Sequence, residues 1–349
     1  MNFELFNSLK GAPDPARALS LFPTLIPFYQ ALGNTPLQPV PSPAGGAQIL
    51  AKYEFVNPFG SVKDRAAFGM FCEAINLHDF SRGPLKLLDA SGGNMGKALA
   101  KLGQLCGIPI HLIIPDSSPP PLVGFLREAG AELSTVESRY FLLGLISRAQ
   151  AIGLRDPGWT LLSQHLNLVN VAVHQYQTGQ EIRRQLANEQ ADGWVAAVGT
   201  GGTLSGVYKA LIQDNPSLVV RGTTPSELPF GTYDPPNDRD KFGGAGGAGG
   251  MGFGFRQPFI AHAGLDTVPF DHINWQESLS TMYEFYRLTG IRIGASAVAN
   301  WRSAYRLAQE MTPAQRVITL FADAGSDDER DRGERYFHEL GALHPASST

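Results

Sequence analysis

Short apolar runs rich in β-branched residues alternate with longer segments of helical periodicity along most of the chain. The apolar runs predict buried strands at residues 48–55, 85–89, 110–114, 133–136, 194–198, 218–222 and 317–321. The segments between them predict helices at residues 62–76, 95–106, 121–129, 142–151, 175–189, 204–213, 275–288 and 297–310. This alternation is typical of an α/β fold with a buried parallel sheet. A chain of 349 residues forms one large or two modest domains of this kind.

The composition excludes several classes of protein. Hydrophobic residues make up 43% of the chain, but no apolar run approaches the roughly 20 residues that span a bilayer, so we expect no membrane contact. A net charge of -4 gives no electrostatic reason to expect nucleic acid as a partner. Two cysteines and eight scattered histidines provide no disulfide framework and no metal site. The first residues lack the features of a signal peptide, so we expect a cytoplasmic protein whose partners are small molecules.

Glycine is concentrated in three clusters, at residues 91–96, 199–206 and 243–254. Such clusters mark places where the backbone turns tightly or approaches a ligand. The proline- and glycine-rich segment 223–255 predicts a functional loop, since a connection of this length is unusual inside a compact domain. The mixed-charge run 327–332 predicts a solvated turn.

Lys63 belongs to residues 57–65, Asn-Pro-Phe-Gly-Ser-Val-Lys-Asp-Arg, between a predicted strand and a helix that begins near Val62. The helix dipole and partial burial would lower the pKa of an amine at that position and give the neutral nucleophile that a Schiff base requires. An isolated lysine is more often a surface residue with its stem laid along apolar neighbours. The surrounding motifs decide between the two interpretations.

Two glycine loops each follow a predicted strand and open a predicted helix. Residues 199–206 present consecutive backbone N–H groups, two threonine hydroxyls and a helix dipole, which together suit a phosphate dianion. This loop lacks both the P-loop lysine and the dinucleotide spacing, which disfavours a nucleotide-binding protein. Residues 91–96 could form a second anion site for a carboxylate, with the Asn94 amide facing a phenolate or carbonyl oxygen. Each loop taken alone could equally be a structural turn.

In order and spacing, these three motifs resemble those of the cysteine synthase and cystathionine β-synthase family of fold-type-II pyridoxal-phosphate enzymes. Segments 164–182, 250–255 and 333–336 also match family segments, and the resemblance runs from about residue 32 to residue 336. It implies two open α/β domains with mostly parallel sheets, the tryptophan synthase β-like fold, with pyridoxal 5'-phosphate in the cleft between them. It further implies a smaller mobile domain at 58–167 with the asparagine loop, and a larger domain at 1–57 and 168–349 with the phosphate loop.

The resemblance also implies the roles of individual residues. Lys63 would be the catalytic residue and would form the internal aldimine, Asn94 would bond the pyridine 3'-oxygen, and Ser296 would face the pyridine nitrogen. A hydroxyl in that last position would not keep the nitrogen protonated, which favours β-elimination over transamination. The residues implied to hold the phosphate are Gly199, Thr200, Gly201, Gly202 and Thr203. The residues implied to contact the amino-acid substrate are Ser91, Gly92, Gly93, Met95, Gln164 and Gly252.

The sequence departs from the family pattern at three places. Met95 stands where the family commonly has a threonine, and a methionine cannot donate a hydroxyl hydrogen bond to the substrate carboxylate. We therefore expect its thioether to line the substrate pocket. Segment 223–249 has no family counterpart, and residues 326–332 are an insertion before the matching segment 333–336.

The expected function is a β-replacement or β-elimination on a small L-amino acid such as an O-activated serine, via an aminoacrylate that a small sulfur or nitrogen nucleophile attacks. A γ-replacement or threonine-synthase-type reaction on a longer amino acid stays open, because of Met95 and the unmatched loop. The alternative from a different functional class is a non-catalytic binding protein with the same fold. The presence of Lys63 argues against this alternative. Family members are commonly homodimers, and we expect the same here.

Overall fold

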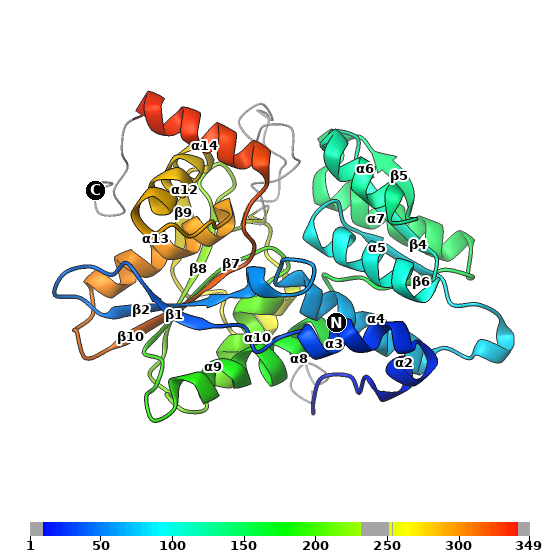
Figure 1. The fold of residues 1–349 in the computed structure, drawn as a ribbon, viewed down its shortest axis with the longest axis horizontal. Coiled ribbons are helices and arrows are strands. Elements are labelled where there is room, and N and C mark those ends of the chain that lie inside the picture. Colours follow the sequence, from blue (N-terminus) through cyan, green and yellow to red (C-terminus); the bar gives the residue numbers. More distant parts are fainter. Residues whose placement is uncertain (1–9, 232–250, 253, 341–349) are drawn as a thin grey trace.

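The computed structural model describes residues 10–231, 251–252 and 254–340, in which strands and helices alternate and form two sheets that lie side by side (Figure 1). The larger sheet has six strands in the order β1-β2-β10-β7-β8-β9. These strands are β1 (Leu37–Val40), β2 (Gln48–Tyr53), β7 (Gly193–Ala197), β8 (Val219–Pro225), β9 (Phe270–Ile273) and β10 (Arg316–Phe321). The smaller sheet has the order β5-β4-β3-β6 and is made of β3 (Leu87–Ala90), β4 (Ile110–Pro115), β5 (Glu132–Val136) and β6 (Thr160–Leu161). Every pairing between these strands is parallel except that of β1 with β2.

Helices cover both faces of each sheet. Around the smaller sheet lie α4 (Lys63–Leu77), α5 (Asn94–Cys106), α6 (Pro120–Glu128) and α7 (Phe141–Arg155), and before them in the chain come α2 (Ala16–Leu21) and α3 (Ile26–Ala31). Around the larger sheet lie α8 (Val169–Val173), a π-helical turn (His174–Thr178), α9 (Gly179–Leu186), α10 (Gly202–Leu211), α11 (Pro258–His262), α12 (Trp275–Thr289), α13 (Ala295–Gln309) and α14 (Asp327–Leu340). Short 3-10 turns occur at Pro23–Leu25, Glu54–Val56, Phe80–Arg82 and Ser138–Tyr140.

The apolar runs form strands because both faces of each sheet are covered. Along β10, Val317 and Phe321 pack on the side of α12 and α13, whereas Ile318 and Leu320 pack on the side of α9 and α10. A strand buried on both faces needs apolar residues at consecutive positions, which is the pattern seen in the sequence. All seven predicted strands and all eight predicted helices are confirmed, with the helix predicted at 175–189 starting earlier through α8 and the π-helical turn.

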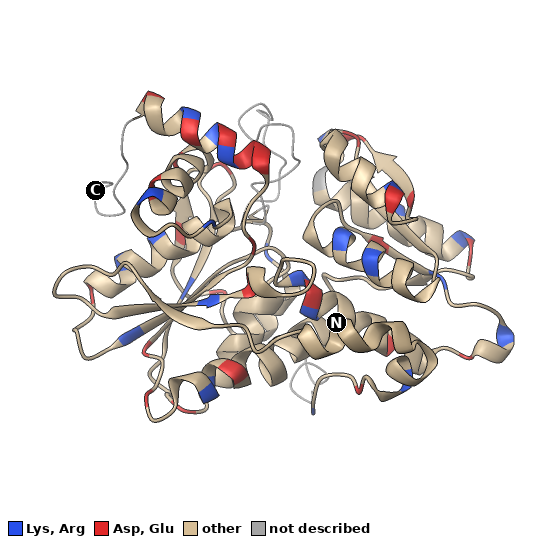
Figure 2. Cartoon of the chain, in the orientation of Figure 1, with Lys and Arg blue, Asp and Glu red and all other residues tan. Residues whose placement is uncertain are grey.

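The prediction of a solvated turn at residues 327–332 is wrong, because these residues form the first turns of α14. Ser326 and Glu329 make reciprocal contacts: the Ser326 hydroxyl accepts from the Glu329 N–H at 3.2 Å, and the Glu329 carboxylate accepts from the Ser326 N–H at 2.8 Å. This capping box, with acidic residues in the first turn, starts a helix where charge alone suggests a loop. Figure 2 shows charges of both signs along α14. Residues 232–250, most of the predicted functional loop, lie outside the described residues, and β8 occupies its first positions.

A buried ion cluster ties the segment before α4 to α9. Arg65, which is 1% exposed, donates to Glu54 at 2.7 and 2.8 Å and to Glu181 at two distances of 2.7 Å. Lys52 adds an ion pair to Glu181 at 2.8 Å. Although burial opposes it, the hydrogen bonds and charge of Arg65 lower the pKa of Glu181 to about 2. The cluster therefore fixes the course of the chain from β2 to α4.

Replacing Arg65 with alanine should lower the free energy of unfolding by about 3–5 kcal/mol, because the buried Glu54 would lose its cationic partner and Glu181 would keep only Lys52. Urea denaturation of the purified variant measures this loss. Arg183→Ala is the matched control, since Arg183 pairs with Asp214 at a partly exposed site where such pairs contribute about 0–1 kcal/mol. Equal losses in the two variants would contradict the role of the cluster.

Candidate functional site

The segment that carries Lys63 is held by its own polar side chains. Asn57 donates to the carbonyl oxygens of Glu54 at 2.9 Å and Ser61 at 3.2 Å, which closes the loop. Asp64 accepts from the Phe59 N–H at 2.6 Å and from the Ser61 hydroxyl at 3.2 Å. These hydrogen bonds hold the loop so that Lys63 is the first residue of α4.

Lys63 differs from its neighbours because its amine has no hydrogen-bond or ion-pair partner in the described part of the chain. Burial lowers the pKa of Lys63 to about 8. A substantial fraction of the amine is therefore neutral near physiological pH, which is the state that attacks a carbonyl carbon. The direction of this shift agrees with the one expected from the sequence, where the helix dipole was named as a second cause.

The glycine loop after β7 is shaped by tight contacts. Gly201 adopts a φ of +84°, and the Thr200 hydroxyl accepts from the Gly202 N–H at 3.2 Å as α10 begins. A Cβ on Gly252 would lie 1.9 Å from the carbonyl oxygen of Val198, so residues 251–252 rest directly on this loop. The structure therefore brings Gly252 together with the five loop residues from Gly199 to Thr203.

Two residues that the sequence analysis had not selected support this loop. Asn170 of α8 donates to the Thr200 hydroxyl at 3.0 Å, and its amide fills the space that a side chain on Gly202 would need. His174 of the π-helical turn lies with Nε2 3.1 Å from the Thr203 hydroxyl. Burial and the charges of Lys63 and Arg65 lower the pKa of His174 well below its ordinary value, so this imidazole is neutral. A π-helical turn is a frequent mark of a functional site but has no simple sequence signature.

A second histidine, His165, lies close enough to Lys63 to feel its charge. Burial, and to a smaller extent the charge of Lys63, lower the pKa of His165 to about 4, although its contact with Gln257 at 3.1 Å opposes the shift. His165 and Gln257 also line a cavity of about 290 Å³ whose apolar wall comes from α7. Gln164 lines the same cavity, with its amide donating to the carbonyl oxygen of Ala90 at 2.9 Å.

The asparagine loop after β3 is only partly open. The Ser91 hydroxyl accepts from the Gly96 N–H at 3.0 Å, and a Cβ on Gly92 would lie 2.9 Å from Pro115. Gly93 is exposed and has open space where a Cβ would point. Asn94 donates to Asp323 at 2.6 Å across the boundary between the two sheets. Of this loop, Gly93 and Asn94 therefore face accessible space.

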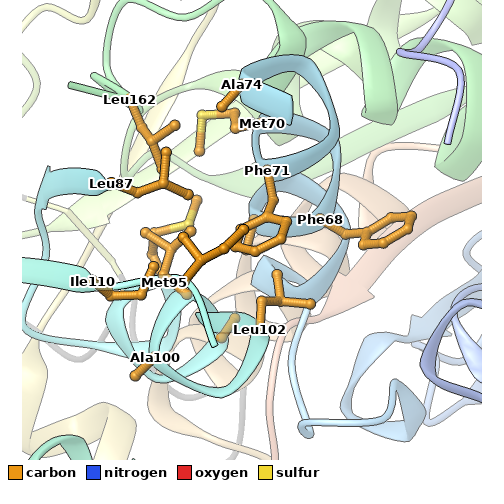
Figure 3. Close-up of a cluster of buried hydrophobic side chains, with 14 of the residues drawn as sticks. Phe68, Met70, Phe71, Ala74, Leu87, Met95, Ala100, Leu102, Ile110 and Leu162 are labelled. Carbon is orange, nitrogen blue, oxygen red and sulfur yellow. The ribbon is translucent and has the colours of Figure 1, made fainter. Parts of the chain in front are cut away.

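Met95 lies in the core of the smaller-sheet unit, whereas the sequence-based expectation placed its thioether along the substrate pocket. It is 2% exposed and packs in the apolar cluster between α4, α5 and the smaller sheet, near Met70, Leu87 and Ile110 (Figure 3). The second position of α5 points into the core, so an apolar residue is favoured there on packing grounds. This placement removes one of the two observations that left a longer amino-acid substrate open; the other is the unmatched segment 223–249, most of which lies outside the described residues.

The turn after β10 joins the separate parts of the site. Val62 donates to the carbonyl oxygen of Ala322 at 2.8 Å, and Gly294, just before α13, donates to that of Asp323 at 2.9 Å. Ser296, at the start of α13, is buried, and its hydroxyl has no hydrogen-bond partner within the described ranges. Residues 333–336, which match a family segment, lie within α14 and not among the residues described above. Gly333 allows α14 to approach Leu279 of α12 closely.

Among the described residues, no helix is long and apolar enough to cross a membrane. Nor does any group of three or more histidine, cysteine, aspartate or glutamate side chains in that part of the chain have a metal-binding arrangement.

Comparison with known proteins gives a consistent set of matches. A model of the family described as pyridoxal-phosphate dependent enzyme matches residues 28–323. The chain is 32% identical over 315 residues to cysteine synthase B of Salmonella typhimurium, covering 88% of this chain and 93% of that protein. It is 29% identical over 294 residues to cysteine synthase B of Campylobacter jejuni, covering 84% and 93%.

Solved structures share the fold. The crystal structure of an O-acetylserine dependent cystathionine beta-synthase from Helicobacter pylori matches with a TM-score of 0.74 and 23% identity, over 87% of this chain and 95% of that one. The crystal structure of an O-ureido-L-serine synthase matches with a TM-score of 0.75 and 22% identity, over 91% and 96%.

The burial of Met95 predicts that a polar substitution there lowers the stability of the fold. Met95→Thr should lower the free energy of unfolding by about 2–4 kcal/mol, because it leaves a cavity and buries a hydroxyl in an apolar cluster. Urea denaturation measures the loss, and Leu105→Thr, at a 37% exposed position of the same helix, is the control with an expected loss below about 1 kcal/mol. An unchanged stability combined with an altered choice of amino-acid substrate would show that Met95 faces the pocket after all.

Proposed function

The chain belongs to the pyridoxal-phosphate-dependent enzyme family, and we propose that it catalyses a β-replacement on a small L-amino acid activated at its β-oxygen, such as O-acetylserine. A small sulfur or nitrogen nucleophile would replace the leaving group. The observation that carries this proposal is the unpaired, partly buried amine of Lys63, with its lowered pKa, among the groups described above. The cysteine synthases to which the chain is similar support the choice of substrate.

The residues present fit the polar groups of pyridoxal 5'-phosphate. Its phosphate suits the N–H groups of residues 199–203 at the start of α10, where a dianion also meets the positive end of the helix dipole. The unpaired hydroxyl of Ser296 suits the pyridine nitrogen, and the remaining N–H of Asn94 suits the phenolic oxygen. Lys63 supplies the amine for the carbonyl carbon.

We propose the following division of work. When bound, the cofactor supplies the electron sink for a carbanion at the α-carbon of the amino acid. Lys63 Nζ takes the proton from that carbon and returns it. The neutral His165, with Gln257, borders the space beside the Lys63 amine. The N–H of Gly93, an exposed residue, and the second N–H of the Gln164 amide would face the substrate carboxylate.

We further propose that residues 58–167 act as a smaller mobile domain, that the chain forms a homodimer, and that it works in the cytoplasm. The domain division is supported by the separate sheet β3–β6, whose strands all fall within those limits. Ile26 and Tyr29 of α3, which are 39% and 40% exposed, are consistent with a covered apolar surface in a dimer. Light scattering of the cofactor-loaded protein tests the dimer.

Lys63→Ala should abolish covalent attachment of the cofactor and lower the rate of cysteine formation from O-acetylserine and sulfide by about 10²–10⁴-fold, because the group that moves the α-proton is lost. Borohydride reduction followed by mass spectrometry of the intact chain measures the attachment. Lys209→Ala, on α10, is the control for loss of another partly buried lysine. A cofactor adduct that survives in Lys63→Ala would refute the assignment, and turnover of O-acetylhomoserine in preference to O-acetylserine would favour γ-replacement.

Gly93→Ala should raise the KM for the amino-acid substrate about tenfold while leaving the free energy of unfolding within about 0.5 kcal/mol, because the added methyl meets no protein atom and enters space assigned to the substrate. Steady-state kinetics and urea denaturation together check this. Gly124→Ala, in an equally open position inside α6, should leave KM unchanged and raise the free energy of unfolding by about 0.5–1 kcal/mol, because alanine favours a helix interior. If Gly93→Ala leaves KM unchanged, the carboxylate is bound elsewhere.

A further inference from the structure

Asp323 lies where the three chain segments of the proposed site meet. It pairs with Ser61, two residues before Lys63, in an isolated antiparallel bridge. Its carbonyl oxygen accepts from the Gly294 N–H at 2.9 Å, two residues before Ser296. Its side chain reaches Asn94 at the start of α5, a residue 229 positions away in the sequence. No other part of the proposed mechanism uses this carboxylate.

Both oxygens of the Asp323 carboxylate act as acceptors. Oδ2 accepts from Asn94 Nδ2 at 2.6 Å, and Oδ1 accepts from the Gly325 N–H at 2.9 Å. Because Oδ2 accepts here, Asn94 presents its NH₂ group to Asp323 and not its oxygen. The contact therefore selects one of the two flipped orientations of the Asn94 amide.

The backbone around this carboxylate is shaped to admit it. A Cβ on Gly294 would lie 2.0 Å from Asp323 Oδ1, so any larger residue there would displace the side chain. Gly325 has a φ of +72°, which turns its N–H toward the same oxygen. Two glycines, on separate segments, thus leave room for one acidic side chain.

We infer that Asp323 is a positioning residue that orients the Asn94 amide, so that the second N–H of Nδ2 is directed at the phenolic oxygen of the cofactor. The inference rests on the proposed role of Asn94. Asp323 acts from the turn after β10 of the larger sheet on a residue of the smaller-sheet unit, so the same hydrogen bond also sets how the asparagine loop meets the rest of the site.

The charges around Asp323 come from two helices. Lys97 of α5 contributes a favourable charge, and Glu329 of α14 contributes a like charge. Burial raises the pKa of Asp323, and burial together with the charge of Asp323 raises the pKa of Glu329 to about 7. Glu329 lies beyond residue 323, the last residue that the family model matches, so this second carboxyl group belongs to the part of the chain outside that match.

A double-mutant cycle on cofactor binding tests the inference. The full-length chain and the variants Asp323→Ala, Asn94→Ala and the double variant are titrated with pyridoxal 5'-phosphate, and the apparent Kd and the visible absorption band are recorded. Asp323→Ala should raise the Kd about 5- to 10-fold and shift the band, as expected when the hydrogen bond from Asn94 to the cofactor is weakened by loss of its orientation. In the Asn94→Ala background the same change should have no further effect on either quantity, because Asp323 acts through Asn94.

Two further variants keep the outcome interpretable. Asp323→Asn retains the volume of the side chain but offers one acceptor oxygen for two N–H donors. Its Kd for the cofactor should therefore lie between those of the native chain and Asp323→Ala. If Asp323→Ala fails to fold, Asp323→Asn takes its place in the cycle. Asp328→Ala, at an exposed position of α14, is the control and should match the native chain. Equal effects of the Asp323 substitution with and without Asn94, or an unshifted band, would overturn the inference. Failure of the native chain to bind the cofactor through Lys63 would instead overturn the proposed function.

Discussion

The buried ion pairs of Arg65 are the constraint on which the rest of the structure depends. A guanidinium that is 1% exposed needs both Glu54 and Glu181 at hydrogen-bond distance, and those residues come from the 3-10 turn after β2 and from α9. These contacts therefore constrain the course of the intervening chain. Buried ion pairs of this kind add little net stability compared with an apolar core, but breaking one is costly. Their effect here is geometric, because Lys63 is held two residues from the fixed point.

The proposed site lies at the carboxyl ends of parallel strands, where the chain leaves each strand and begins a helix. The segment of Lys63 follows β2, the asparagine loop follows β3, the glycine loop follows β7, and Asp323 follows β10. Ligand sites of open α/β sheets occupy this edge because loops from several strands converge there. The helices α4, α5, α10 and α13 also begin there, and their positive dipole ends create a field suited to an anionic cofactor.

The sequence predicted the strands and helices whose burial produces a clear hydrophobic pattern. It predicted fewer of the features that depend on contacts between residues far apart in the sequence. β10 is apolar throughout because both of its faces are buried, whereas β1 contains Pro39 at the sheet edge and β6 has two residues, so neither has a strand pattern. The motifs around Lys63 and Gly201 were visible because each is a local arrangement. The direction of the Met95 side chain could not be predicted, because a family pattern gives the position of a residue in the sequence but not which face of its helix the residue lies on. The contact between Asn94 and Asp323 spans 229 residues and leaves no local signal.

The packing of Met95 also makes the asparagine loop mechanically continuous with the interior of the smaller sheet. Its side chain is fixed among Leu87, Leu102 and Ile110, one residue after Asn94 (Figure 3). Close-packed interiors transmit displacement rather than absorb it. A substitution that changes the volume of this core is therefore expected to displace Asn94 as well as to lower stability. Packing in the interior and chemistry at the edge of this unit are thus constraints on the same residues.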